Sequence, residues 1–312
     1  ANNLDVLTAG EWRQYVSDHN LTDAVDYGAN TDWQKAIQQT AISHSHTLSF
    51  SSGGEDNGLR ASMNYLRNEG IIKFSDLDRV SASLTAYQYG LNNRLKVELS
   101  LQANADKRHN VDKGIYSTIY NMNPTAPIYD ENGNYLETTT SWTGGTEENP
   151  LYEATLKSYD RSKSWELINN TELLWNIDNY WLLKGQFSVT KSNSDSRQFL
   201  DPRSKKNSEP LNANNVISGQ LDVATANSLS WDATATLSYN RNIKKNNLNF
   251  LIGINATSST GDSFGIAYKG FPSGELSSPG YANKVPTLPV NSDSKSRLFG
   301  ALGTFNYSFD NI

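Results

Sequence analysis

The sequence predicts an all-β fold, an antiparallel transmembrane β-barrel to which this chain contributes about nine strands. Three observations predict it. Apolar and polar residues alternate over many segments, which is typical of strands with one apolar face. The clearest of these segments is long enough to cross a bilayer obliquely. The connections between the segments alternate between short and long along the chain.

The composition excludes several classes of protein for this chain. The chain of 312 residues has 37% hydrophobic residues, a mean hydropathy of -0.61 and no apolar run of about 18 residues, which excludes membrane-spanning helices. Barrels remain compatible, because half of each strand faces a polar lumen. The net charge of -6 argues against a nucleic-acid partner. Cysteine is absent, which excludes disulfides and thiolate metal sites within this sequence.

The first 46 residues are expected to be helical in part. Thr8 and Glu11 match a capping box at the start of one short amphipathic helix. A second capping box is expected to begin at Thr31, ahead of another short helix. We expect both helices to lie on other protein surface, and neither carries recognisable chemistry.

The clearest strand spans residues 95–105, in which every odd-numbered residue is apolar and every even-numbered residue is polar. Its 11 residues rise ~3.3 Å each. A strand of this length, tilted by ~45°, crosses about 25 Å, which is the height of the apolar band of a bilayer. The segment therefore predicts a bilayer-crossing strand with Leu99 on the lipid face and Ser100 on the lumen face.

Similar alternation marks the other expected strands. They lie at residues 47–52, 59–66, 79–89, 165–177, 181–190, 231–239, 248–256 and 299–309. The fifth in chain order, 165–177, is the least regular, because Ile168 and Leu174 share a face with glutamates. Short turns follow the odd-numbered strands, and longer connections follow the even-numbered ones. Outer-membrane barrels keep short turns on one side and long loops on the other.

The odd number of strands predicts an incomplete barrel. A sheet in lipid cannot leave an edge unpaired, and bacterial single-chain barrels have an even number of strands. We therefore expect further strands beyond the C-terminus, or beyond both ends.

Several segments resemble SusC/RagA-type TonB-dependent outer-membrane transporters. They are DYGANTDWQ at 26–34 with Thr40 and Ala41 after it, HTLSFSSGG at 46–54, ASMNYLRNEGIIK at 61–73 with Asp78 and Arg79 after it, NPTAPIYDENG at 123–133, and SRLF at 296–299. The resemblance runs in order over essentially the whole chain.

The resemblance implies a barrel of about 22 strands with a plug in its lumen. It also implies import of large nutrients, oligosaccharides or oligopeptides, with energy delivered by TonB and a SusD-like lipoprotein as a lid. A dimer of transporter–lipoprotein pairs is compatible with it. In this plan residues 1–46 form an extracellular loop segment with short helices, and residues 47–312 form part of the barrel. The plug and the TonB-contacting box then lie outside this chain.

Six aromatic residues of the long loops are candidates for substrate contact. They are Tyr116, Tyr120, Tyr129, Tyr135, Trp142 and Tyr152. Aromatic rings stack on sugar rings, and they also pack loops or a lid protein, so both interpretations stay open. Aromatic residues at strand ends, such as Trp165 and Trp181, suit the girdles of a barrel at the membrane interface.

Six polar residues of the expected lumen face are candidates for contact with a plug or with substrate. They are Arg60, Lys96, Glu98, Gln102, Lys184 and Asp232. Nothing in the sequence indicates catalysis, because a hydrolase needs a nucleophile, a base and an orienting acid together, and the four histidines lie in loop-like contexts.

No metal or cofactor is predicted. His44 and His46 share one face of an extended segment, without an evident third ligand. The segment that begins at Asp130 is similar to a calcium loop, but Gly133 falls at the fourth position instead of the sixth. A hairpin turn at Asn132 and Gly133 explains it better.

The resemblance and the strand pattern together predict a non-enzymatic importer in the bacterial outer membrane, surrounded by outer-membrane lipid. Two rivals stay open. One is a surface β-protein that does not transport, such as an adhesin or a glycan-binding module. The other is a passive porin.

Overall fold

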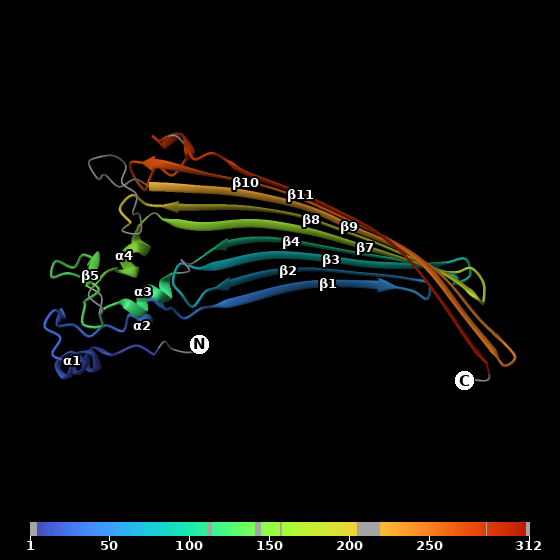
Figure 1. Ribbon diagram of the computed structural model, residues 1–312, viewed down its shortest axis with the longest axis horizontal. Coiled ribbons are helices and arrows are strands. Elements are labelled where there is room, and N and C mark those ends of the chain that lie inside the picture. Colours follow the sequence, from blue (N-terminus) through green and yellow to red (C-terminus); the bar gives the residue numbers. More distant parts are fainter. Residues whose placement is uncertain are drawn as a thin grey trace.

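The structure is a computed structural model, which describes residues 5–110, 114–140, 145–156, 158–204, 219–284 and 286–309 (Figure 1). Within these residues, nine strands form one antiparallel sheet. The order of strands in the sheet is β1-β2-β3-β4-β7-β8-β9-β10-β11, so each strand pairs with the next main strand along the chain. The predicted antiparallel sheet and its nine strands are therefore confirmed.

The strands are longer than the sequence predicted. They are β1 (Ser43–Gly53), β2 (Asn57–Glu69), β3 (Asp76–Gly90), β4 (Leu95–His109), β7 (Tyr159–Asn176), β8 (Trp181–Leu200), β9 (Gly219–Ile243), β10 (Asn246–Phe271) and β11 (Val290–Phe309). Their lengths run from 11 residues in β1 to 26 in β10. Most of the additional residues lie at the end of the sheet that carries the long connections.

The two ends of the sheet differ, as the sequence predicted. Short turns at residues 54–56, 91–94, 177–180 and 244–245 lie at one end, on the right in Figure 1. The long connections and all labelled helices lie at the other end. The turn at 91–94 is tight, because Leu91, Asn92 and Asn93 all adopt positive φ angles.

The register divides the sheet into an apolar face and a polar face, because directly paired residues share a face. On the apolar face, the rung through Leu99 joins Leu59, Ala86, Leu99, Thr171, Phe187, Ala233, Ala256 and Phe299. On the polar face, the rung through Ser100 joins Ser51, Arg60, Thr85, Ser100, Asn170, Ser188, Asp232, Thr257 and Leu298, of which Leu298 is the apolar exception. Ile168 and Leu174 lie on the polar face, as predicted.

The apolar face is exposed. Leu48 is 77% exposed, Phe50 59% and Phe299 68%. Soluble monomers rarely expose apolar patches of this extent. The face therefore fits apolar surroundings, as in the lipid-facing side of a barrel wall.

The predicted capping box of α1 (Ala9–Asp18) is confirmed. The Thr8 hydroxyl accepts a hydrogen bond from the Glu11 amide at 3.3 Å, and the Glu11 carboxylate accepts one from the Thr8 amide at 2.9 Å. In the described residues, no helix combines the length and hydropathy that a membrane span requires.

The second predicted capping box is wrong. The N-cap of α2 (Trp33–Ile37) is Asp32, whose carboxylate accepts a hydrogen bond from the Lys35 amide at 2.9 Å. The Thr31 hydroxyl is engaged elsewhere, because it donates to the carbonyl oxygen of Ala126 at 2.6 Å. The Thr31 hydroxyl thus binds the distant loop around Ala126 instead of capping the helix that follows it.

The connection between β4 and β7 carries its own secondary structure. It contains α3 (Ile115–Asn121), β5 (Thr138–Thr140), β6 (Thr146–Glu148) and α4 (Pro150–Thr155), and a short helix η1 (Pro279–Tyr281) follows β10. We call residues 5–42, 70–75, 114–140 and 145–156 the loop layer.

Candidate functional site

The polar face of the sheet brings together the six side chains that were predicted to face the lumen. Arg60 and Asp232 lie on the rung of Ser100, and Lys96 and Lys184 share the rung of Leu174. Glu98 and Gln102 belong to the rungs through Glu172 and Ile168. The register thus places all six on one face. Contact with a plug or with substrate stays a prediction.

Opposite charges are paired on this face, toward the end of the sheet that carries the short turns. The Lys96 ammonium lies 2.6 Å from the Glu98 carboxylate, and the Lys184 ammonium lies 3.1 Å from Glu172. The Gln186 amide donates to the Glu172 carboxylate at 2.8 Å. These partly exposed pairs present both donors and acceptors to whatever lies against the face.

A shallow hollow of about 390 Å³ lies beside these pairs. It is lined by Glu98, Ser100, Asn170, Thr171, Glu172, Gln186, Phe187, Ser188 and Asp232. The Asp232 carboxylate accepts a hydrogen bond from the Asn255 amide at 2.8 Å. The lining is mostly small and polar, so the hollow suits hydrogen-bonding contacts more than apolar ones.

Segments far apart in the chain meet in a small core of the loop layer. This core consists of Trp33, Ile37, Ile72, Ile119, Met122, Ala126 and Leu151. Trp33 is 4% exposed, and its indole N–H donates to the carbonyl oxygen of Asn123 at 2.9 Å. The core therefore joins α2, which precedes β1, to α3, which follows β4.

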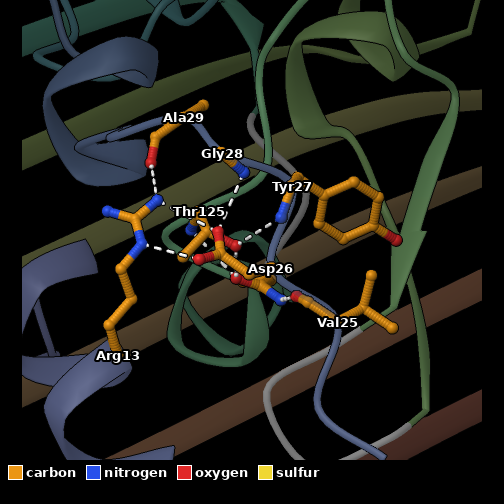
Figure 2. A network of polar contacts seen from close by, with 8 residues as sticks. Arg13, Val25, Asp26, Tyr27, Gly28, Ala29 and Thr125 are labelled. Atoms are coloured by element: carbon orange, nitrogen blue, oxygen red, sulfur yellow. Dashed lines mark hydrogen bonds and ion pairs between the residues drawn. The ribbon is translucent and has the colours of Figure 1, made fainter.

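A polar network beside this core begins at α1. The Arg13 guanidinium binds the Asp26 carboxylate through two hydrogen bonds of 2.8 and 3.0 Å, and donates to the Ala29 carbonyl oxygen at 2.8 Å (Figure 2). Asp26 also accepts a hydrogen bond from the Gly28 amide at 2.8 Å. The Arg13 guanidinium and the Gly28 amide together lower the pKa of Asp26 to about 2.

The same network reaches across to the β4–β7 connection. The Tyr27 amide donates to the Thr125 hydroxyl at 3.1 Å, and the Ala29 amide donates to the Thr125 carbonyl oxygen at 2.8 Å (Figure 2). The Asn123 side chain donates to the Val25 carbonyl oxygen at 2.8 Å. Two segments that resemble the transporter family in sequence, 26–34 and 123–133, are thus neighbours in space.

The predicted aromatic residues of the loops lie in separate places. Tyr116 and Tyr120 are both on α3 and are 45% and 51% exposed. Tyr129 and Tyr135 pack against each other in the hairpin around Gly133, with ring centroids 4.7 Å apart. Tyr152 on α4 is half-buried, and this burial raises the pKa of its hydroxyl. Trp142 lies outside the described residues.

The hairpin confirms the predicted turn at Asn132 and Gly133. Gly133 adopts a φ of 80°, and the Asp130 carboxylate accepts hydrogen bonds from the amides of Asn132 and Asn134 at 2.9 and 2.8 Å. These amides hold the pKa of Asp130 below its usual value. The carboxylate therefore closes the turn.

Sequence reasoning missed a larger cavity of about 790 Å³ between the strand tips and helices α3 and α4. Its apolar lining includes Phe74, Ile115 and Phe199, and its charged lining includes Glu153 and Arg161. None of the five predicted aromatic residues that the structure describes lines it. Its walls come from five separate stretches of the chain, which no local pattern could have indicated.

Comparison with known proteins finds relatives in sequence and in structure. No family model matches the chain. The TonB-dependent receptor SusC of Bacteroides thetaiotaomicron is 28% identical over 190 residues, which cover 54% of this chain and 19% of SusC. The TonB-dependent receptor P3 of Formosa agariphila is 23% identical over 99% of this chain and 31% of its own length.

Solved structures of RagAB have the same fold. The RagAB peptide importer in the closed-closed state superposes with a TM-score of 0.74 and 23% identity, over 99% of this chain and 36% of that one. Its open-open state gives the same TM-score of 0.74. The chain thus spans about a third or less of the length of these relatives. The resemblance to SusC/RagA-type TonB-dependent receptors is confirmed, and the sheet has the fold of part of such a barrel.

Proposed function

We propose that this part of a TonB-dependent receptor forms the wall of an outer-membrane importer of large nutrients. The observation that carries the proposal is the division of the sheet into an exposed apolar face and a polar face. This division suits a wall between lipid and a polar lumen. The relatives are named as receptors and importers, which supports transport over catalysis.

The substrate class follows from the resemblance and from RagAB. Peptide import is the activity named for the RagAB structures, and the family resemblance adds oligosaccharides. We therefore propose oligopeptides or glycans as substrates. The paired charges around Glu98, Glu172 and Lys184 supply donors and acceptors for either class, or for a plug.

The loop layer is proposed to lie outside the cell under a SusD-like lipoprotein. In this arrangement residues 1–46 form an extracellular segment, and the barrel wall follows from residue 47; the first strand itself begins at Ser43. The exposed rings of Tyr116 and Tyr120 offer apolar area to such a lid or to substrate. A dimer of transporter–lipoprotein pairs remains part of the proposal.

Fractionation of cells tests the location. The full-length protein is expected in the outer-membrane fraction and should require detergent for extraction. Recovery from the soluble fraction without detergent would contradict the proposal.

Uptake by a deletion strain tests the activity and its rivals. Growth on defined peptides and glycans is expected to fail for one substrate class when the gene is deleted, and to fail equally when TonB is deleted. Uptake that survives the loss of TonB indicates a passive porin. Unchanged growth of the gene-deletion strain on every substrate indicates a surface protein that does not transport.

A further inference from the structure

Like charges lie directly opposite each other near the loop end of the apolar face. Among the described residues, Arg161 of β7 pairs in register with Arg197 of β8, and Lys107 of β4 pairs with Lys163 of β7. Directly opposed Cβ atoms are only ~4.5–5.5 Å apart, so like charges there destabilise a sheet. An anion that binds between them would reverse the sign of this interaction.

These four side chains are available to an anion. All four are exposed, and within the part of the chain that the structure describes none of them forms an ion pair. The Arg161 guanidinium lies over the ring of Tyr159, 4.6 Å from its centroid, which leaves its charge uncompensated by a carboxylate.

The acidic residues on the same two rungs only partly offset this charge. Asp78 faces Lys107 but is bound to Arg67 at 3.1 Å, and Asp76 is bound to His109 at 2.8 Å. Asp195 faces Lys163 in register. Glu69 pairs in register with Asp76 and adds a fourth acidic residue to these rungs. Five described Lys and Arg side chains therefore face four acidic side chains, and we call the five the basic belt: Arg67, Lys107, Arg161, Lys163 and Arg197.

The basic belt lies at the boundary of the apolar face. From β2 to β7, the next rung toward the short turns carries Tyr65 and Trp165, and the rung after it carries Met63 and Leu167. In β8 this last rung continues into Lys191. Trp165 is 42% exposed and Leu167 is 45% exposed. A sequence of cations, then aromatic rings, then aliphatic side chains is typical of the passage from headgroups to acyl chains.

We infer that the basic belt binds the phosphate groups of a phosphorylated lipid in the outer leaflet of the membrane, whose acyl chains lie along the apolar face. Arg guanidinium groups bind phosphate through two parallel hydrogen bonds, and Lys contributes a point charge. The inference rests on the proposed outer-membrane location. It concerns the face opposite the polar one; of the belt residues, Arg161 also lines the cavity between the strand tips and helices α3 and α4.

Lipid titration of the full-length receptor in neutral detergent tests the inference. Lipid A with its phosphate groups should bind and raise the thermal midpoint, whereas lipid A stripped of phosphate should do so far less. The double variant Arg161→Gln with Arg197→Gln should lose about tenfold or more in affinity, because two charge-assisted hydrogen-bonding groups are removed. Lys107→Gln with Lys163→Gln should act in the same direction.

Two controls keep the outcome interpretable. Without lipid, the Lys107 and Lys163 double variant should melt no lower than the wild-type protein, because a repulsive pair is removed. Arg241→Gln with Lys244→Gln removes the same charge at the short-turn end and should leave lipid A affinity unchanged.

Three results would overturn the inference. They are equal binding of phosphorylated and stripped lipid A, unchanged binding by both belt variants, and saturation by inorganic phosphate at the concentration that suffices for lipid A. Uptake assayed in cells separates this inference from the proposed function. Lost uptake with intact lipid binding counts against transport alone, and normal uptake without phosphate-dependent lipid binding counts against the belt alone.

Discussion

The sheet and the loop layer place their apolar residues in opposite ways. In the sheet, Leu48 and Phe50 point to an exposed face. In the loop layer, Trp33 and Ile119 are buried in a core of 4% and 2% exposure. The loop layer thus buries its apolar side chains, as a water-soluble domain does, whereas the sheet exposes them on one face, as the wall of a membrane barrel does. The same kind of substitution should therefore have different effects in the loop layer and in the sheet.

The largest effect is expected in the core of the loop layer. Trp33→Ala removes a buried indole and its hydrogen bond to Asn123, and should destabilise the loop layer by about 3–5 kcal/mol. Hydrogen exchange of peptides from α2 and α3 should rise together, while the strands stay protected. Trp33→Phe keeps most of the packing and should lose less. Unchanged exchange in the alanine variant would show that this core does not hold the two loops together.

The sheet should respond to charge on one face only. Leu99→Arg, near the middle of the apolar face, should cost about 2–4 kcal/mol in folding into lipid vesicles. Ser100→Arg should cost far less, because Ser100 lines the hollow of the polar face. Urea titrations of the full-length protein measure both. Equal effects would mean that the lipid and lumen faces are assigned wrongly.

A buried amide in the loop layer should have an intermediate effect. The Asn149 side chain donates to the carbonyl oxygens of Ile128 and Leu136 at 3.1 and 2.8 Å and caps α4 by accepting from the Leu151 amide. Asn149→Ala leaves these groups unsatisfied and should cost about 1–3 kcal/mol. Protease sensitivity of the β4–β7 connection measures it. The exposed Asn132→Ala serves as the matched control and should stay close to wild type.

The smallest expected effect is the loss of stability at acidic pH when the Asp26 carboxylate is protonated. Because the pKa of Asp26 is lowered from 3.8 to about 2, its pairing with Arg13 stabilises the fold fully above pH 3.8. This contribution is lost as the pH falls through about 2. It should stay below about 1 kcal/mol, because the pair is exposed. Asp26→Asn should abolish that part of the pH dependence in hydrogen exchange of residues 25–31, and an identical pH profile in the variant would contradict this role.

The difference between the two regions also decides what the sequence could predict. Alternation located all nine strands of the large sheet and assigned Leu99 and Ser100 to opposite faces, because lipid and lumen impose opposite polarity. It failed at the outer ends of β9 and β10, where residues 219–230 and 257–271 continue the ladder. Residues 257–263 are all polar or glycine, so the period-two contrast is lost there while backbone pairing persists.

The loop layer was predictable only where its contacts are local. The capping box of Thr8 and Glu11 and the turn at Gly133 depend on neighbouring residues, and both were found. The Thr31 hydroxyl and the cavity around Phe199 depend on partners far along the chain, and both were missed. The binding roles proposed for the six aromatic residues and the six polar residues stay predictions, because neither a loop position nor a place on the polar face indicates what lies against a side chain.

The tie between α2 and α3 has a consequence for the order of assembly. Trp33 and Asn123 are 90 residues apart, and the four strands β1 to β4 lie between them in the chain. Closing so long a loop early is entropically unfavourable, whereas the hairpins between these strands close short loops. We therefore expect the tie to form after the four strands have paired. Once formed, it links the segments that precede β1 and follow β4 at the loop end of these strands.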